Sequence, residues 1–331
     1  MEEEEEERKQ HKFEEKETLS RDVYAFGIGM MQFIKRKAPT LDTPFKGVSD
    51  FKDLVLKGER PSLPRDEIDC PKSLAELLRE CWHDNPKKRP TFQDILHRFE
   101  EHILIDCATV DPNARKFWKE NFFNPGDSKQ ELRTNIPWKE FAVKFLKNFD
   151  SKSYDEKDVE MKVFNEICST KGSVTLENFG RTVGFFFPLV PLLQLKNTDV
   201  GWLRKVSFTV RQPWFFGDID SDEAFKRLRI KNKEGDFLLR FSKSGSNWTL
   251  SYIGQKNSVY HTRILHPPSS FTFTVEGKNA STFDSLQELV SYLKATELIS
   301  NVCEGHPFAA FFNEQSQEAR NEGYAELDFS N

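Results

Sequence analysis

The spacing of apolar residues divides the chain into a helical part and a strand-rich part. Up to about residue 205, apolar residues recur every three or four positions, as in helices buried on one face. After Pro213, short apolar runs alternate with turns rich in Gly, Ser and Asn, which predicts strands. Helical patterns at Ser221–Arg229 and Ser285–Ala295 flank these runs, so we expect an α+β module with an antiparallel sheet and two helices. The predicted strands are Phe237–Ser242, Trp248–Ile253, Val259–Ile264 and Phe271–Val275.

Prolines and capping residues separate the helical part into segments. Pro71 suits the first turn of a helix, where its missing N–H is not needed, and Thr91 suits an N-cap. The middle region, about 112–205, is predicted to be helical apart from a turn at 171–173 and a short strand after it. Its aromatic stripes, which include Phe141 and Phe145, are interpreted as core. The predicted N-terminal helices are 21–37, 47–57, 71–82 and 91–105.

Composition excludes several classes of protein. The 331 residues carry a net charge of −5, which disfavours nucleic-acid binding. The five cysteines lie far apart without a C-x-x-C pair, which favours reduced thiols and disfavours a zinc site or a disulfide framework. No apolar run approaches the roughly 20 residues of a membrane span, and the N-terminal Glu run is unlike a signal peptide. We therefore expect a cytoplasmic, multidomain protein without a metal or cofactor.

One predicted strand contains an arginine at a position where a buried residue is expected. Arg240 lies in the run Phe237–Ser242, between leucine and phenylalanine. Burying a guanidinium without a partner is costly, so such a residue needs an anion nearby. Either a carboxylate of the protein supplies that anion, which makes Arg240 a scaffold residue, or a ligand does, which makes it a binding residue.

The blocks of sequence around Arg240 occur in the order of a known domain. They are Trp214–Gly217, Ala224 with Leu228, Phe237–Ser242, Tyr260–Ile264 and Thr282–Val290. In this order and spacing, residues 213–300 resemble an SH2 (Src-homology 2) domain. The resemblance implies a central antiparallel sheet between two helices and a function in phosphotyrosine binding.

The chemistry of that ligand explains the residue types. A phosphotyrosine carries nearly two negative charges on three strong acceptor oxygens, and a guanidinium can grip two of them at once. An arginine at the floor of a pocket would select tyrosine, because a phosphoserine is too short to reach it. The resemblance assigns Arg240 to that floor. It adds the Ser242 hydroxyl, the donor-rich loop with Lys243 and Ser244, His261 to order the pocket, and Arg263 to pack against the tyrosine ring.

Two positions depart from the commonest SH2 pattern. Ser221 stands where an arginine is often found early in the first helix. One phosphate contact is therefore either absent or supplied by Lys243. Thr262 stands where some members carry an aromatic residue that shapes peptide selectivity, so the sequence does not indicate the preferred ligand.

The N-terminal region resembles a second family. Arg21–Gly27, Gly58–Pro61 and Cys81–Pro90 are similar to the end of a protein kinase catalytic domain, over about residues 19–102. The sequence contains no G-x-G-x-x-G loop, V-A-I-K lysine, H-R-D loop or D-F-G motif, which bind nucleotide and magnesium and orient the acceptor. We therefore expect no catalytic residue and no phosphoryl transfer by the chain as given.

Three residues of this kinase-like region are predicted to be structural: Asp22, Trp82 and Arg89. In the family, the residue at Asp22 braces the catalytic loop, and the arginine at Arg89 pairs with a glutamate of the activation segment. Here we expect both to be exposed or satisfied locally. A substitute pair between Arg89 and the run Glu2–Glu7 is the alternative.

The order of the domains resembles the C-terminal half of the SH2-bearing dual-specificity kinases of social amoebae. The segment Val174–Gly180 also resembles helical EF-hand-like linkers that precede other SH2 domains. It is not predicted to bind calcium, because Asp150–Asp155 lacks the required glycine and has a lysine at a ligand position. The predicted domains are a disordered acidic leader (1–18), a truncated, all-α kinase C-lobe (19–105), a helical EF-hand-like linker (106–205), an SH2 domain (206–303) and a mobile tail (304–331).

The leading interpretation is a phosphotyrosine-binding signalling protein with a catalytically incomplete kinase remnant. The alternative is a fragment of an active dual-specificity kinase. A phosphotyrosine-driven transcription factor is disfavoured, because no basic DNA-reading region is present. The expected partners are tyrosine-phosphorylated proteins, which could recruit the chain to membrane-associated signalling complexes. Self-association through the kinase remnant or through phosphorylated Tyr324 is a further hypothesis.

Overall fold

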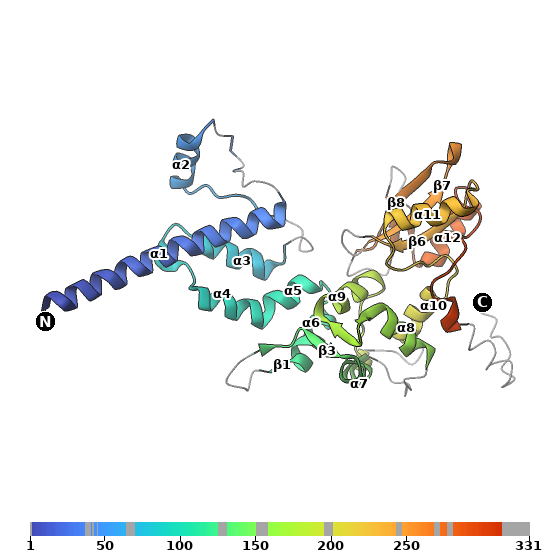
Figure 1. The fold of residues 1–331 in the computed structure, drawn as a ribbon, viewed down its shortest axis with the longest axis horizontal. Helices are drawn as coiled ribbons and strands as arrows, with labels where there is room; N and C mark the ends of the chain where they lie inside the picture. Colours follow the sequence, from blue (N-terminus) through green and yellow to red (C-terminus); the bar gives the residue numbers. More distant parts are fainter. Residues whose placement is uncertain are drawn as a thin grey trace. The chain divides into compact units, whose positions relative to one another are not determined.

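The computed structural model divides into two compact units, Met1–Cys107 with Phe123–Leu132, and Ala108–Phe122 with Arg133–Asn331. Figure 1 shows the helices and strands that build them. Within these units, the structure describes residues 2–36, 41, 43–44, 46–63, 70–124, 131–149, 158–194, 201–242, 247–267, 272–276 and 281–312. None of the described helices combines the length and apolar character that a membrane crossing requires.

The first unit is built from helices around one apolar core. Gly27 lets α1 approach α3 closely, because a Cβ there would lie 2.8 Å from the Cβ of Cys81. Thr91 caps α4 as predicted, in a capping box with Asp94. Its elements are α1 (Glu2–Lys35), α2 (Val48–Leu56), α3 (Lys72–Cys81), η1 (Pro86–Lys88), α4 (Phe92–Arg98), the π-helix η2 (Phe99–Ile103), α5 (Leu104–Ala108) and the strands β1 (Phe123–Asn124) and β2 (Glu131–Leu132).

The helix α1 extends further toward the N-terminus than the apolar pattern predicts. It begins at Glu2 and so includes most of the stretch 1–18, for which the charge run predicts disorder. Glutamate is among the better helix-forming residues, so this run is compatible with continuing a helix that packing stabilises further along. The apolar periodicity detected only the packed part, which starts near Val23.

The second unit begins with a helical region whose core is aromatic. Phe117, Phe141, Phe145, Phe164 and Phe179 are all at most 2% exposed, which confirms the core interpretation of the stripes. The sequence predicted a short strand after the 171–173 turn, and the structure places β5 there in a three-stranded sheet of order β3-β5-β4. The elements are α6 (Pro112–Phe122), β3 (Asn135–Pro137), α7 (Trp138–Phe149), α8 (Val159–Cys168), β4 (Ser169–Thr170), β5 (Ser173–Thr175), α9 (Leu176–Phe185), η3 (Leu192–Gln194) and α10 (Trp202–Val210). The candidate calcium-loop segment 150–155 lies outside the described residues.

The same unit continues into a five-stranded antiparallel sheet of order β10-β9-β8-β7-β6. Helix α11 packs on the face that carries Leu238. Helix α12 lies toward the other face, because Lys294 sits over the ring of Phe237 at 5.6 Å. The elements are α11 (Ser221–Lys231), β6 (Phe237–Phe241), β7 (Trp248–Ile253), η4 (Gln255–Asn257), β8 (Val259–Leu265), β9 (Phe273–Val275), β10 (Thr282–Phe283) and α12 (Leu286–Ala295). The predicted α+β module is therefore confirmed.

The region predicted as a mobile tail is described in its first part, 304–312. There the ring of Phe308 packs 5.2 Å from the ring of Phe215, so this stretch contacts the sheet domain. Residues 313–331, including Tyr324, lie outside the described residues.

Candidate functional site

Strand β6 fixes the position of Arg240 by hydrogen bonds on both of its edges. On one side β7 pairs with it, with Arg240 opposite Thr249. On the other side Leu239 N donates to the carbonyl of Trp214 at 2.8 Å, and Phe241 N donates to the carbonyl of Gly217 at 2.9 Å. All five residues of β6 are buried, so the strand forms a rigid floor for the side chain of Arg240.

The guanidinium of Arg240 is buried, and the acceptors that bind it within the described residues are neutral. The residue is 6% exposed. Its Nε donates to the hydroxyl of Ser251 at 3.2 Å, and its Nη1 donates to the carbonyls of Phe241 at 3.3 Å and Ile219 at 3.4 Å. Within the described part of the chain, no carboxylate forms an ion pair with it, and its Nη2 has no hydrogen-bond partner.

Burial is the main electrostatic influence on Arg240. It lowers the pKa of the guanidinium below its ordinary value, while the nearby carboxylate of Asp220 acts in the opposite direction. An arginine remains charged in proteins even so. The strand therefore holds a positive charge that Asp220 offsets from a distance and that no carboxylate of the described residues contacts in an ion pair.

Ser251 links Arg240 to His261 and was not predicted from the sequence. Its hydroxyl oxygen accepts from Arg240 Nε, so its hydrogen is available to His261 Nδ1, which lies 2.9 Å away. A hydroxyl has one hydrogen and two lone pairs, so Ser251 can accept from Arg240 Nε and still share a hydrogen bond with either tautomer of His261. The feature that identifies Ser251 is the pairing register of β6 and β7. Ser251 on β7 faces the same side of the sheet as Thr249, the partner of Arg240.

Of the other predicted ligand residues, the structure describes Ser242 and Arg263. Ser242 is 8% exposed and follows Arg240 by two residues, and its N donates to the carbonyl of Asn247 at 2.8 Å. Arg263 is exposed and lies opposite Thr249 on β8, so it shares the sheet face of Arg240. Lys243 and Ser244 lie outside the described residues.

The start of α11, which lies near Arg240 in space, is acidic. Asp220 is its N-cap and accepts from Glu223 N at 2.8 Å. Asp222 and Glu223 are in the first turn, where Ser221 occupies the position that often carries an arginine. This helix end therefore adds no cation to the site, and Asp220 carries a charge of the same sign as a phosphate.

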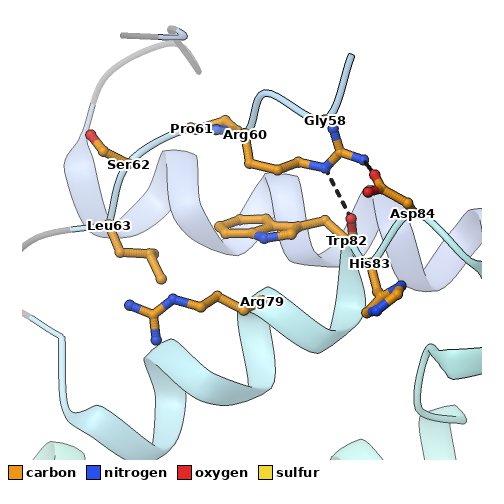
Figure 2. Close-up of a pocket in the computed structure, with 9 residues that line it drawn as sticks. All are labelled: Gly58, Arg60, Pro61, Ser62, Leu63, Arg79, Trp82, His83 and Asp84. Atoms are coloured by element: carbon orange, nitrogen blue, oxygen red, sulfur yellow. Dashed lines mark hydrogen bonds and ion pairs between the residues drawn. The ribbon is translucent and has the colours of Figure 1, made fainter. Parts of the chain in front are cut away.

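The kinase-like unit contains a separate pocket of about 420 Å³, drawn in Figure 2. Arg60 extends over Trp82, donates from Nε to the Trp82 carbonyl at 3.0 Å and forms an ion pair with Asp84. Trp82 itself is 4% exposed and belongs to the core of the unit. These contacts tie the loop 58–61 to the end of α3, which is a structural task.

The two other residues predicted to be structural in this unit differ in their surroundings. Arg89 donates from Nε to the carbonyl of His83 at 2.9 Å and from Nη1 to the carbonyl of Ser20 at 3.0 Å. Its guanidinium also lies 4.9 Å from the ring centre of Tyr24. Asp22 is exposed and has no hydrogen bond or ion pair in the part of the chain that the structure describes. Arg89 is thus satisfied locally, and the side chains of Glu2–Glu7 lie outside the description.

Comparison with protein families finds one match within each unit. The SH2 domain family matches residues 214–293, and the protein tyrosine and serine/threonine kinase family matches residues 7–99. The chain carries an SH2 domain and part of a kinase domain. Arg240 lies within the SH2 match, and the SH2 fold implies phosphotyrosine binding.

Relatives share this combination over most of the chain. Dual specificity protein kinase shkD of Dictyostelium discoideum is 34% identical over 276 residues, which are 81% of this chain and 35% of the relative. The kinases shkA and shkC of the same organism are 32% and 31% identical over 87% and 82% of this chain, and over 54% and 52% of their own lengths. The chain is homologous to these SH2-containing kinases and spans between 35% and 54% of their lengths.

The protonation of His261 gives a test of the candidate phosphate site around Arg240. Burial and the charge of Arg240 lower the pKa of His261 from its ordinary value of 6.5. A bound phosphate offsets the charge of Arg240, so we expect phenyl phosphate to raise this pKa and the complex to take up protons. NMR titration of the His261 ring signals, with and without phenyl phosphate, measures the change. An unchanged or lower pKa at saturation contradicts a position for His261 beside the phosphate.

Proposed function

We propose that this chain is a phosphotyrosine-binding signalling protein whose binding site centres on Arg240. The observation that carries the proposal is that Arg240 is buried in β6 without an ion pair in the described residues. Of the two sources of an anion that its burial requires, the ligand is therefore favoured over a carboxylate of the protein. Binding of the full chain to phosphotyrosyl peptides with randomised flanks, compared with the same peptides unphosphorylated, tests the proposal.

Each predicted site residue has a role in this proposal. Arg240 grips two phosphate oxygens, and Ser251 with His261 holds its Nε end in place. Ser242, Lys243 and Ser244 donate further hydrogen bonds to the phosphate, and Arg263 packs against the tyrosine ring. The expected partners are tyrosine-phosphorylated proteins, which the chain would meet in the cytoplasm or at membrane-associated signalling complexes.

We further propose that the kinase-like part is catalytically incomplete in the chain as given. The reason is the lack of the nucleotide-binding and magnesium-binding motifs in the sequence. In this proposal Asp22, Trp82 and Arg89 keep only structural roles, and the helical region between the two domains acts as an EF-hand-like linker without calcium. Association of two copies, through the kinase-like unit or through phosphorylated Tyr324, would add a regulatory function, and light scattering before and after tyrosine phosphorylation tests it.

We expect no stabilisation of the full chain by ATP with magnesium. The sequence motifs that hold the ATP phosphates and the magnesium are missing. Mg-ATP therefore has no site at which its binding would stabilise the folded chain. Differential scanning fluorimetry with and without Mg-ATP measures this, with phenyl phosphate as the positive control for the SH2 pocket. An ATP-dependent rise in the melting temperature contradicts the proposal that the chain binds no nucleotide.

The second candidate function is that of a part of an active dual-specificity kinase. It is favoured by the names of the relatives and by the fraction of their lengths that this chain spans. In that case the nucleotide-binding half would be encoded upstream of the sequence given. A longer transcript whose product phosphorylates a test substrate would support this candidate.

A further inference from the structure

The end of helix α9 packs against β6 directly behind Arg240. Phe185 is 1% exposed, and its ring stacks on the ring of Phe241 with centroids 4.0 Å apart and an angle of 20°. The carbonyl of Phe185 also accepts a hydrogen bond from Trp248 Nε1 at 2.7 Å. Because neighbouring residues of a strand point to opposite faces, Phe185 lies on the face opposite to the side chain of Arg240.

One turn earlier on α9, Arg181 makes a second contact with the SH2 domain. Its Nη1 and Nη2 donate to the two carboxylate oxygens of Asp218 at 2.8 Å and 2.7 Å. Arg181 and Phe185 are four residues apart, so they share a face of the helix, and the guanidinium lies 5.4 Å from the Phe185 ring centre. Besides Trp248, helix α9 therefore contacts the SH2 domain at Asp218 and Phe241.

Asp218 and Phe241 both lie at or next to residues whose carbonyls accept hydrogen bonds from Arg240. Its Nη1 donates to the carbonyl of Phe241, whose ring stacks on Phe185. It also donates to the carbonyl of Ile219, the residue after Asp218. Both hydrogen bonds are long, at 3.3 Å and 3.4 Å, so a small further displacement of either carbonyl breaks its hydrogen bond to Nη1.

We propose that α9 positions the guanidinium of Arg240 through Arg181 and Phe185, so that the helical region sets the phosphotyrosine affinity of the SH2 domain. This inference rests on the proposed function of Arg240. Arg181 and Phe185 are positioning residues in it, since they act through Asp218 and Phe241 and not on the ligand. A rearrangement of α9 would thereby alter phosphotyrosine binding without any change in the pocket residues.

An alternative role of these contacts is to stabilise the fold without positioning Arg240. Removing the Arg181–Asp218 ion pair distinguishes these two roles. Its side chains are 39% and 54% exposed. Ion pairs with this exposure contribute little to folding stability. Loss of the pair should therefore leave the melting temperature unchanged, whereas loss of positioning should weaken phosphate binding.

The test uses the full chain with Arg181→Ala, Phe185→Leu and the matched control Arg133→Ala. Arg133 forms a bidentate ion pair of the same kind with Glu140, at 2.8 Å and 2.9 Å and with 41% and 34% exposure, and both residues belong to the helical region. The measurements are phenyl phosphate affinity, the ¹⁵N–¹H NMR signal of Arg240 Nε in the ligand-free protein, and the melting temperature.

We expect Arg181→Ala to weaken phenyl phosphate binding about 3- to 10-fold and to move the Arg240 Nε signal at an unchanged melting temperature. Phe185→Leu should also weaken binding and move the Arg240 Nε signal, with a lower melting temperature because the residue is buried. Arg181→Lys should restore part of the affinity, and Arg133→Ala should have no effect. Wild-type affinity and an unmoved Arg240 signal in Arg181→Ala and Phe185→Leu overturn the inference. If wild-type protein fails to bind phenyl phosphate, the proposed function fails, and the Arg240 signal in the ligand-free variants still reports whether α9 positions Arg240.

Discussion

Replacing Arg240 with alanine should reduce phosphotyrosine binding by about 2–5 kcal/mol, the cost of removing one partner of a desolvated charge pair. The guanidinium is 6% exposed, so a bound phosphate would meet it with little competing water. Arg240→Lys should recover only part of the loss, because an ammonium keeps the charge but cannot grip two oxygens in one plane. Isothermal titration with a phosphotyrosyl peptide pool measures both variants.

The matched control for this prediction is Arg229→Ala. Arg229 is exposed on α11 of the same SH2 domain, and its Nη1 donates to the side chain of Asn232. The substitution changes the net charge by the same amount, so it separates a general electrostatic effect from the loss of the Arg240 contact. Melting curves must accompany the titrations, because Arg240→Ala also leaves the carbonyl of Ile219 without its donor. Equal affinity of wild type and a folded Arg240→Ala contradicts the proposed site.

The largest loss of stability is expected from Phe145→Ala in the aromatic core of the helical region. The ring of Phe145 lies 4.8 Å from that of Phe164 and 5.6 Å from that of Trp202, and the residue is fully buried. Truncation removes these contacts and leaves a cavity, which costs about 3–5 kcal/mol for a buried phenylalanine. Urea denaturation followed by tryptophan fluorescence measures the change in the free energy of unfolding.

Val143→Ala provides the comparison for Phe145→Ala. Val143 is on the same helix, α7, but is 69% exposed, so its truncation should change stability by less than about 0.5 kcal/mol. A Phe145→Ala variant as stable as Val143→Ala would mean that this aromatic cluster does not hold the helical region together.

The strands around the site were predictable because burial and alternation leave a clear pattern. The run Phe237–Ser242 was expected as a strand, and β6 covers Phe237–Phe241. Trp248–Ile253 was expected and found with the same bounds. Arg240 itself was detectable because a charged residue interrupts an apolar run, which is energetically unusual.

The groups that hold Arg240 could not be predicted from composition or spacing. Two of its three acceptors are backbone carbonyls, of Phe241 and Ile219, and a carbonyl is present at every residue. The third, Ser251, is a small polar residue whose role depends on the register between β6 and β7. Strand register depends on long-range pairing, which a local pattern does not specify.

The contact between α9 and the SH2 domain was missed for a similar reason. Phe185 and its neighbour Phe186 read as an apolar end of a helix closed by Pro188, and the pattern does not say which surface they cover. In the structure Phe186 is fully buried and packs against Phe241 and Trp248. The helical region and the SH2 domain, predicted as separate domains, thus share part of one core.

The most direct test of the central claim is a titration of the full chain with three peptide pools that share the same randomised flanks. One pool carries phosphotyrosine, one phosphoserine and one unphosphorylated tyrosine at the fixed position. Because the proposal places the buried Arg240 at the floor of the site, we expect saturable binding of the phosphotyrosine pool alone, and its loss in Arg240→Ala. Equal binding of the phosphoserine pool, or no binding of the phosphotyrosine pool, would contradict the account.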